Sequence, residues 1–330
     1  MNFFKKNINI ILSVVVLIIC AATWYVWDNS RTVEPASEEY VWNSTLETEY
    51  IEYNGKKYVL NPDIETILIG GVDKDGKIDM SEPNESGGHA DMLFLVVVNN
   101  KTKTVDKIQI NRDTMTEIDV LDDNFSVKGT AIAQIALSHA YGNGGSVSCL
   151  NTVKAVENLL FGIEINKYMF LNMGAMPIVN DFFGGVEVLV EDSFAGIDDT
   201  LVRGKRIKLN GEQAYNFLRS RKGLEDASNV NRMKRHRQYV DNMIDTIKDS
   251  VEKEEISVFD LYNEIYDYMA TSLSASEITS LVVKTKDYTD NNIIVPKGEF
   301  NEENEFMEFY TDDEALRRLV MDLFYIEYEE

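Results

Sequence analysis

Two apolar runs without polar alternation limit the folds open to this chain. Residues 66–73 read TILIGGVD and residues 92–99 read MLFLVVVN. Strands that are apolar on both faces are typical of a sheet covered on both sides. A third run, residues 105–110, alternates in polarity and follows the turn-forming residues 99–101. It is the expected hairpin partner of the second run.

Helical apolar spacing alternates with strand-like runs through the middle of the chain. Helices are expected over residues 131–140, 146–161, 174–183, 211–218 and 230–250, and further strands over residues 168–171 and 186–190. This alternation predicts an α/β (α+β) fold, a mixed central β-sheet flanked by helices on both faces.

The predicted domain covers residues 61–330. Its motifs lie in residues 65–250. Residues 251–330 carry 21 Asp/Glu against six Lys/Arg. They keep apolar periodicity, so we expect them to complete the same domain.

An uncharged apolar segment precedes this domain. Residues 8–27 would form a helix of about 30 Å, the thickness of a bilayer core, with aromatic residues at its far end and two lysines before it. We therefore expect a cytoplasmic N-terminus and transmembrane anchor over residues 1–28, followed by an extracellular stalk over residues 29–60. The alternative is a cleaved signal peptide, but the segment is long and no A-x-A site follows it.

Composition excludes two classes of function. The formal net charge is −24, whereas general nucleic-acid binding needs a basic surface. The chain has two cysteines and three histidines, which are few potential ligands for a structural zinc site.

One basic segment stands against this acidic background. Residues 203–237 hold eleven Lys/Arg and three acids, a local net charge of +8. A solvated helix face is the simplest interpretation of a charge run. However, Arg219 and Arg221 are two residues apart, and Arg232 and Arg235 are three apart, which places each pair on one face of a strand or of a helix. Guanidinium pairs of this kind suit a pyrophosphate.

Acidic residues follow or precede the predicted strands. Asp73 ends the first run, Asp91 precedes the second, and Arg112-Asp113 follows the third. If the strands are neighbours, these groups meet at one end of the sheet, where Asp73 and Asp91 could bind Mg²⁺. For any one acid alone, a turn or cap role is the alternative.

The order of these motifs resembles the LytR-CpsA-Psr family of cell-wall glycopolymer transferases. The resemblance covers residues 65–250 and rests on GVD, GG-x-A-D-M, N-R-D-T, G-G-V-x-V, L-N-G-E-Q-A, R-S-R and R-x-x-R-x-R-Q. It implies a membrane-anchored phosphotransferase on the outer face of a Gram-positive cell. Such an enzyme moves a glycopolymer from a polyprenyl-pyrophosphate carrier to peptidoglycan with Mg²⁺, or with Mn²⁺ in its place.

The resemblance also assigns residues. The metal-associated acids are Asp73 and Asp91, the catalytic residues are Arg112, Asp113, Arg219 and Arg221, and the pyrophosphate-binding residues are Arg112, Arg219, Arg221, Arg232, Arg235 and Gln238. The chain departs from the usual "GRSDTM", which reads GHADML from Gly88, and Asn111 replaces the usual proline.

Two other functions use the same residues. One is a pyrophosphatase with water as the acceptor, and the other is a non-catalytic membrane-bound regulator or lipid-binding module. The sequence does not identify the glycopolymer, the acceptor hydroxyl, the general base or the oligomeric state.

Overall fold

The computed structural model describes most of the predicted domain. It covers residues 41–43, 50–53, 55–81, 87–220, 257–285, 288–301 and 307–328, with residues 224, 235, 238–239, 242–243 and 246. The predicted transmembrane segment, Arg221 and Arg232 lie outside the described residues. None of the helices in the described part of the chain has the length and apolar character that a membrane crossing requires.

A six-stranded mixed sheet forms the centre of the molecule, in the order β12-β9-β4-β5-β6-β13. Its strands are β4 (Ile64–Val72), β5 (Ala90–Asn99), β6 (Thr104–Ile110), β9 (Lys167–Asn172), β12 (Met269–Thr271) and β13 (Thr289–Ile294). β4, β5 and β6 form an antiparallel meander, while β9 runs parallel to β4 and β13 runs parallel to β6. The predicted mixed sheet and the hairpin after β5 are confirmed.

The sheet separates two hydrophobic cores. On β5, Phe94, Val96 and Val98 face one core, and Leu93, Leu95 and Val97 face the other. Successive side chains of a strand point to opposite faces, so burial of both faces requires an unbroken apolar run. This explains the MLFLVVVN segment.

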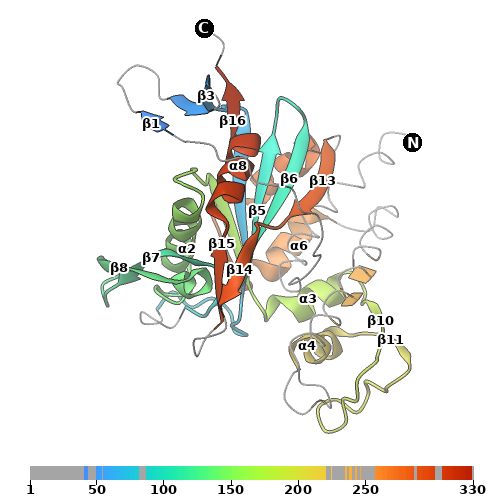
Figure 1. Cartoon of the computed structure of the whole chain (residues 1–330). Helices are drawn as coiled ribbons and strands as arrows, with labels where there is room; N and C mark the ends of the chain where they lie inside the picture. The colour runs from blue at the N-terminus through green and yellow to red at the C-terminus, as the bar shows by residue number, and fades with distance from the viewer. Residues whose placement is uncertain are drawn as a thin grey trace, which may run out of the picture.

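Helices cover both faces, as the sequence predicts (Figure 1). One core contains side chains of α3 (Ala175–Phe182), α4 (Gly211–Arg219), α6 (Val258–Ile265) and α7 (Ala275–Thr285). The other contains side chains of α2 (Ser146–Leu159), α8 (Asp313–Phe324) and the 3₁₀ segment η1 (Ile135–His139). A second 3₁₀ segment, η2 (Tyr266–Tyr268), leads into β12. The sheet and both cores thus include residues from beyond position 250.

The helix predicted over residues 131–140 is wrong. Residues up to Gln134 belong to β8 (Val127–Gln134), which pairs with β7 (Met115–Leu121), and η1 follows. Most of β8 is exposed and only its end, at Ala133, packs against a core, so the segment has no buried stripe to define a helical face. Pairing with β7 satisfies its backbone instead, and tertiary context overrides local propensity. The hairpin projects beside α2 in Figure 1.

Smaller sheets complete the fold. β10 (Glu187–Leu189) pairs with β11 (Arg206–Lys208), and β14 (Gly298–Asn301) pairs with β15 (Glu308–Thr311). A four-stranded sheet contains β1 (Val41–Asn43), β2 (Tyr50–Tyr53), β3 (Lys56–Leu60) and β16 (Tyr325–Glu327). The described part of the predicted stalk is therefore stranded, and β3 pairs with the C-terminal strand β16. The stalk boundary at residue 60 stays a prediction.

Candidate functional site

The strand ends bring two predicted metal ligands together through a β-bulge. Gly71 of β4 pairs with Met92 of β5, but the next residue, Val72, pairs with Ala90. Asp91 is therefore the extra residue of the bulge. A bulge re-aims side chains beside functional sites. Here the bulge also directs the Ala90 side chain towards the core that contains Leu93.

His89 lies between these two acids. Its backbone N–H donates to Asp73 Oδ1 at 2.6 Å, and its Nδ1 lies 3.7 Å from Asp73 Oδ2. One side-chain ligand atom each from Asp73, His89 and Asp91 lies within 4.8 Å of the others. His89 is not among the site residues that the sequence predicts; it stands where the family motif GRSDTM has an arginine. The sequence feature that could have identified it is a histidine, a potential nitrogen ligand, two residues before Asp91.

A buried histidine supports the glycines that precede His89. His139 Nδ1 lies 3.0 Å from Gly87 O and 3.2 Å from Gly88 O, so this nitrogen carries the proton and donates to them. Complete burial lowers the pKa of His139 to about 4, which keeps it neutral at pH 7. Gly88 has φ +77°, a conformation that glycine adopts without a steric cost.

A glycine in β4 leaves space for the aromatic ring that packs against His139. The His139 ring stacks on Phe170, with ring centroids 5.2 Å apart. Phe170 is the β9 partner of Gly70, and a Cβ at Gly70 would lie 2.1 Å from the Phe170 ring. The first glycine of the pair in TILIGGVD, Gly70, therefore leaves room for the aromatic ring on which His139 rests.

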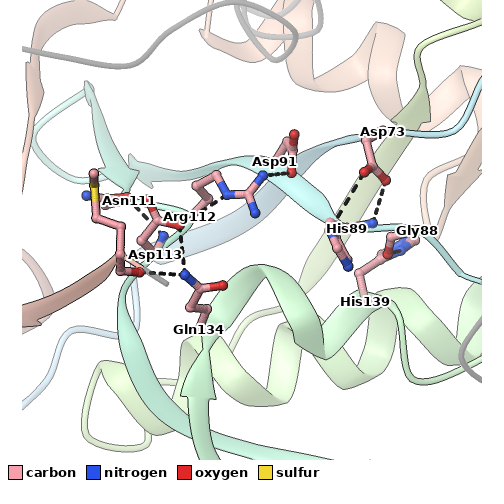
Figure 2. Close-up of polar contacts among 10 residues, drawn as sticks. Asp73, Gly88, His89, Asp91, Asn111, Arg112, Asp113, Gln134 and His139 are labelled. Carbon is pink, nitrogen blue, oxygen red and sulfur yellow. Dashed lines mark hydrogen bonds and ion pairs between the residues drawn. The ribbon is translucent and has the colours of Figure 1, made fainter. Parts of the chain in front are cut away.

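Arg112 links two carboxylates just after β6. It forms ion pairs with Asp91 and with Asp113, the latter at 3.2 Å between Nε and Oδ1 (Figure 2). Gln134 Nε2 donates to the same Asp113 oxygen at 3.1 Å. Burial raises the pKa of Asp113, and Arg112 opposes this effect. We name Asp73, His89, Asp91, Arg112 and Asp113 the strand-end cluster.

A second group lies at the C-terminal end of α4. Asn210 caps the start of this helix in a capping box with Gln213, as the sequence predicts a helix start there. At its end, Arg219 forms an ion pair with Asp75, and Tyr215 donates to Asp75 Oδ1 at 2.5 Å. Burial and this hydrogen bond raise the pKa of Tyr215 to about 12. We name Asp75, Tyr215 and Arg219 the helix-end cluster.

The chain itself connects the two clusters. Asp75 follows Asp73 by two residues, so their Cα atoms are within about 7 Å of each other. Arg219 thus pairs with an acid that lies two residues along the chain from Asp73 of the strand-end cluster. Neither Asp75 nor Tyr215 is among the site residues that the sequence predicts. The four-residue spacing of Tyr215 and Arg219 on a helix was the available signal.

Two other predicted pyrophosphate ligands contact the protein's own backbone. Arg235 is only 4% exposed; its Nε donates to Phe217 O at 3.0 Å, Nη2 donates to Ser220 O, and Nη1 lies 2.5 Å from Asp192 Oδ2. Gln238 Oε1 accepts from the Leu189 N–H at 2.6 Å. Among the described residues, neither side chain contacts a side chain of the two clusters, although Arg235 holds the backbone on both sides of Arg219. Pyrophosphate contact by Arg235, Gln238, Arg221 and Arg232 stays a prediction.

The fold and site together define an α/β domain with carboxylates and arginines gathered at the ends of its central strands. A sequence profile of the LytR_cpsA_psr family matches residues 34–317. The chain belongs to this family, as its motifs indicated.

Named relatives agree with this assignment. One is the polyisoprenyl-teichoic acid–peptidoglycan teichoic acid transferase TagU of Bacillus subtilis (strain 168), which is 30% identical over 222 residues, 67% of this chain and 62% of the relative. The protein of the same name from Bacillus licheniformis is 29% identical over 236 residues, 71% of this chain and 67% of the relative. The match thus spans less than two thirds of the Bacillus subtilis protein.

Solved structures share the fold. TagV of B. subtilis has a TM-score of 0.52 at 21% identity, covering 80% of this chain and 98% of TagV. A structure of TagT bound to LI-WTA has a TM-score of 0.53 at 21% identity, covering 79% of this chain and 90% of TagT.

Proposed function

We propose that this protein is a phosphotransferase that moves a glycopolymer from a polyprenyl-pyrophosphate carrier to peptidoglycan. Membership of the LytR_cpsA_psr family and the names of the TagU relatives support this class of reaction. The observation that carries the proposal is that Arg112 pairs with Asp91 beside Asp73, while Arg219 pairs with Asp75, two residues after Asp73. Fixed cations beside acids suit a pyrophosphate whose charge shifts during transfer.

The reaction breaks the bridging P–O bond of the carrier pyrophosphate. A hydroxyl of peptidoglycan forms the new bond to the phosphorus on the glycan side, and polyprenyl phosphate leaves. Arg112 and Arg219 hold the pyrophosphate and stabilise the charge on the leaving phosphate. The catalytic and pyrophosphate-binding roles of Arg221 belong to the same proposal.

The proton of the acceptor hydroxyl needs a base. Asp113 is the carboxylate that we propose for this task, because burial raises its pKa while Arg112 and Gln134 fix its position. A raised pKa makes a carboxylate a stronger base. Asp91, the other partner of Arg112, is the alternative.

A divalent cation, Mg²⁺ or Mn²⁺, fits the donor set at the strand ends. Asp73 and Asp91 offer carboxylate oxygens, the ligands that Mg²⁺ and Mn²⁺ favour alongside phosphate oxygens. When bound, the cation supplies charge neutralisation for the pyrophosphate.

The test is transfer of a labelled lipid-pyrophosphate glycan by the full chain in detergent, with and without peptidoglycan. Arg112→Ala and Arg219→Ala are each expected to lower turnover by roughly 10²–10³-fold. Arg206→Ala is the matched control, since Arg206 belongs to the same basic segment and lies on β11 paired with Glu187 at 3.6 Å. Full turnover in both variants contradicts the site. Release of free glycan phosphate without peptidoglycan indicates the pyrophosphatase, and binding without turnover indicates the regulator.

The proposed location is the outer face of the cell membrane, with a single anchor at residues 8–27 and a cytoplasmic N-terminus. The charge-free apolar segment after two lysines supports it. Full-length chain is expected to remain in membranes after alkaline extraction, and a variant lacking residues 8–27 is expected to be released. Release of both forms contradicts the anchor.

A further inference from the structure

The imidazole of His89 lies among the strand-end carboxylates of Asp73 and Asp91. We propose that His89 is a third protein ligand of the metal ion, and that it makes the site bind Mn²⁺ in preference to Mg²⁺. The proposal rests on the proposed function only in placing a divalent cation at Asp73 and Asp91.

The main chain of His89 is fixed by both acids. Its carbonyl accepts from the Asp73 N–H at 3.1 Å and from the Asp91 N–H at 3.0 Å, and its own N–H donates to Asp73 Oδ1. The glycines before it are held by His139. With the backbone fixed in this way, the imidazole can reach the two carboxylates by side-chain rotation alone.

The separations suit one shared ion. Donor atoms about 2.1 Å from an octahedral ion lie about 3 Å apart when adjacent and about 4.2 Å apart when opposite. His89 Nδ1 and Asp73 Oδ2 are 3.7 Å apart, and ligand atoms of all three side chains lie within 4.8 Å. Small rotations would bring all three within coordination distance of a single cation.

The nitrogen donor changes which ion is favoured. Mg²⁺ prefers oxygen ligands in near-ideal octahedral geometry and keeps several waters. Imidazole nitrogen is a ligand of transition ions rather than of Mg²⁺, and Mn²⁺ is the transition ion that shares the preference of Mg²⁺ for carboxylate oxygens. Two carboxylates with one imidazole therefore favour Mn²⁺.

The experiment measures the metal, not turnover. Full-length protein in detergent is titrated with Mn²⁺, and the bound ion is followed by electron paramagnetic resonance with spin-echo modulation, which detects a directly bonded ¹⁴N. We expect ¹⁴N modulation in the wild type and its loss in His89→Ala and His89→Gln. Even a hydrogen-bond partner of a metal ligand contributes roughly 10- to 100-fold in affinity, so Mn²⁺ binding should weaken at least about tenfold. Competition should require a large excess of Mg²⁺ in the wild type and less in the variants.

His236→Ala is the matched control, because it removes another of the three histidines. Mn²⁺ binding without ¹⁴N modulation, modulation that survives His89→Ala, or no Mn²⁺ binding overturns the proposal. Transfer activity is measured separately. A wild type that shows His89-dependent modulation but no transfer contradicts the proposed function alone, and transfer without modulation contradicts the ligand assignment alone.

Discussion

The strand-end cluster and the helix-end cluster are held in place by different means. Strands β4, β5 and β6 carry the first, whose side chains range from 15% exposed at Asp113 to 41% at His89. The second lies at the surface, where Arg219 and Asp75 are 45% and 48% exposed. Sheet register positions the acids, whereas side-chain contacts position the arginine.

The end of α4 depends on one buried side chain. Arg235 donates to the carbonyls of Phe217 and Ser220, on either side of Arg219, and pairs with Asp192 beneath them. The helix-end cluster should therefore respond to substitutions far along the sequence, and the strand-end cluster should respond mainly to changes within the sheet. Four predictions test this difference.

The largest effect is expected for Asp113→Asn in the strand-end cluster. An amide cannot accept the proton of the acceptor hydroxyl, so turnover should fall by roughly 10²–10⁴-fold. The wild-type rate should rise with pH through the raised pKa of Asp113, above the ordinary aspartate range, and the variant should lose this limb. Asp123→Asn, at the exposed β7–β8 turn, is the control. An unchanged pH–rate profile in Asp113→Asn assigns the base elsewhere.

Arg235→Ala should lower the free energy of unfolding, because Arg235 bonds the backbone at the end of α4 that carries the helix-end cluster. It leaves Asp192, 14% exposed, without its buried partner. Removing one partner of a buried pair typically costs about 3–5 kcal/mol in the free energy of unfolding. Urea unfolding followed by circular dichroism measures this. Arg206→Ala should change stability by less than about 0.5 kcal/mol. A similarly small change in Arg235→Ala would mean that the helix end has other support.

His139→Asn should change how stability depends on pH. The folded-state pKa of His139, about 4, lies below its ordinary value of 6.5. Its contribution is therefore complete above pH 6.5 and is lost as the pH falls towards 4. The wild type should lose up to roughly 3 kcal/mol of unfolding free energy over this range, and the variant should lack this component. Parallel pH dependences of the two proteins contradict the assignment.

The smallest effect is expected for Asp75→Asn. The ion pair with Arg219 is about half exposed, so its loss should change the free energy of unfolding by less than about 1 kcal/mol. Because Asp75 is the contact that positions Arg219, the variant should bind the anionic donor more weakly, with KM raised about two- to fivefold. Asp267→Asn, which breaks the exposed pair with Lys77, is the control. An unchanged or lowered KM in Asp75→Asn would mean that Asp75 does not position Arg219 for the donor.

Local patterns determined four strands of the central sheet (β4, β5, β6 and β9), the helices α2, α3 and α4, and the family. Unbroken apolar runs gave strands buried on both faces, and the Asn210 capping signal gave the start of α4. These features depend on residues close together in the sequence, which is why they can be read from it. The placement of Asp73, Asp91, Arg112 and Asp113 at one end of the sheet followed from the strand order.

Only the tertiary structure decided the contacts between distant segments. It paired β8 with β7, buried Arg235 against Asp192, and joined Arg219 to Asp75 across 144 positions of sequence. It also created the bulge that brings Asp91 towards Asp73 and His89. The free energies of such contacts depend on burial and on partners that sequence spacing does not specify, so residue type alone could not separate a ligand-facing arginine from a structural one.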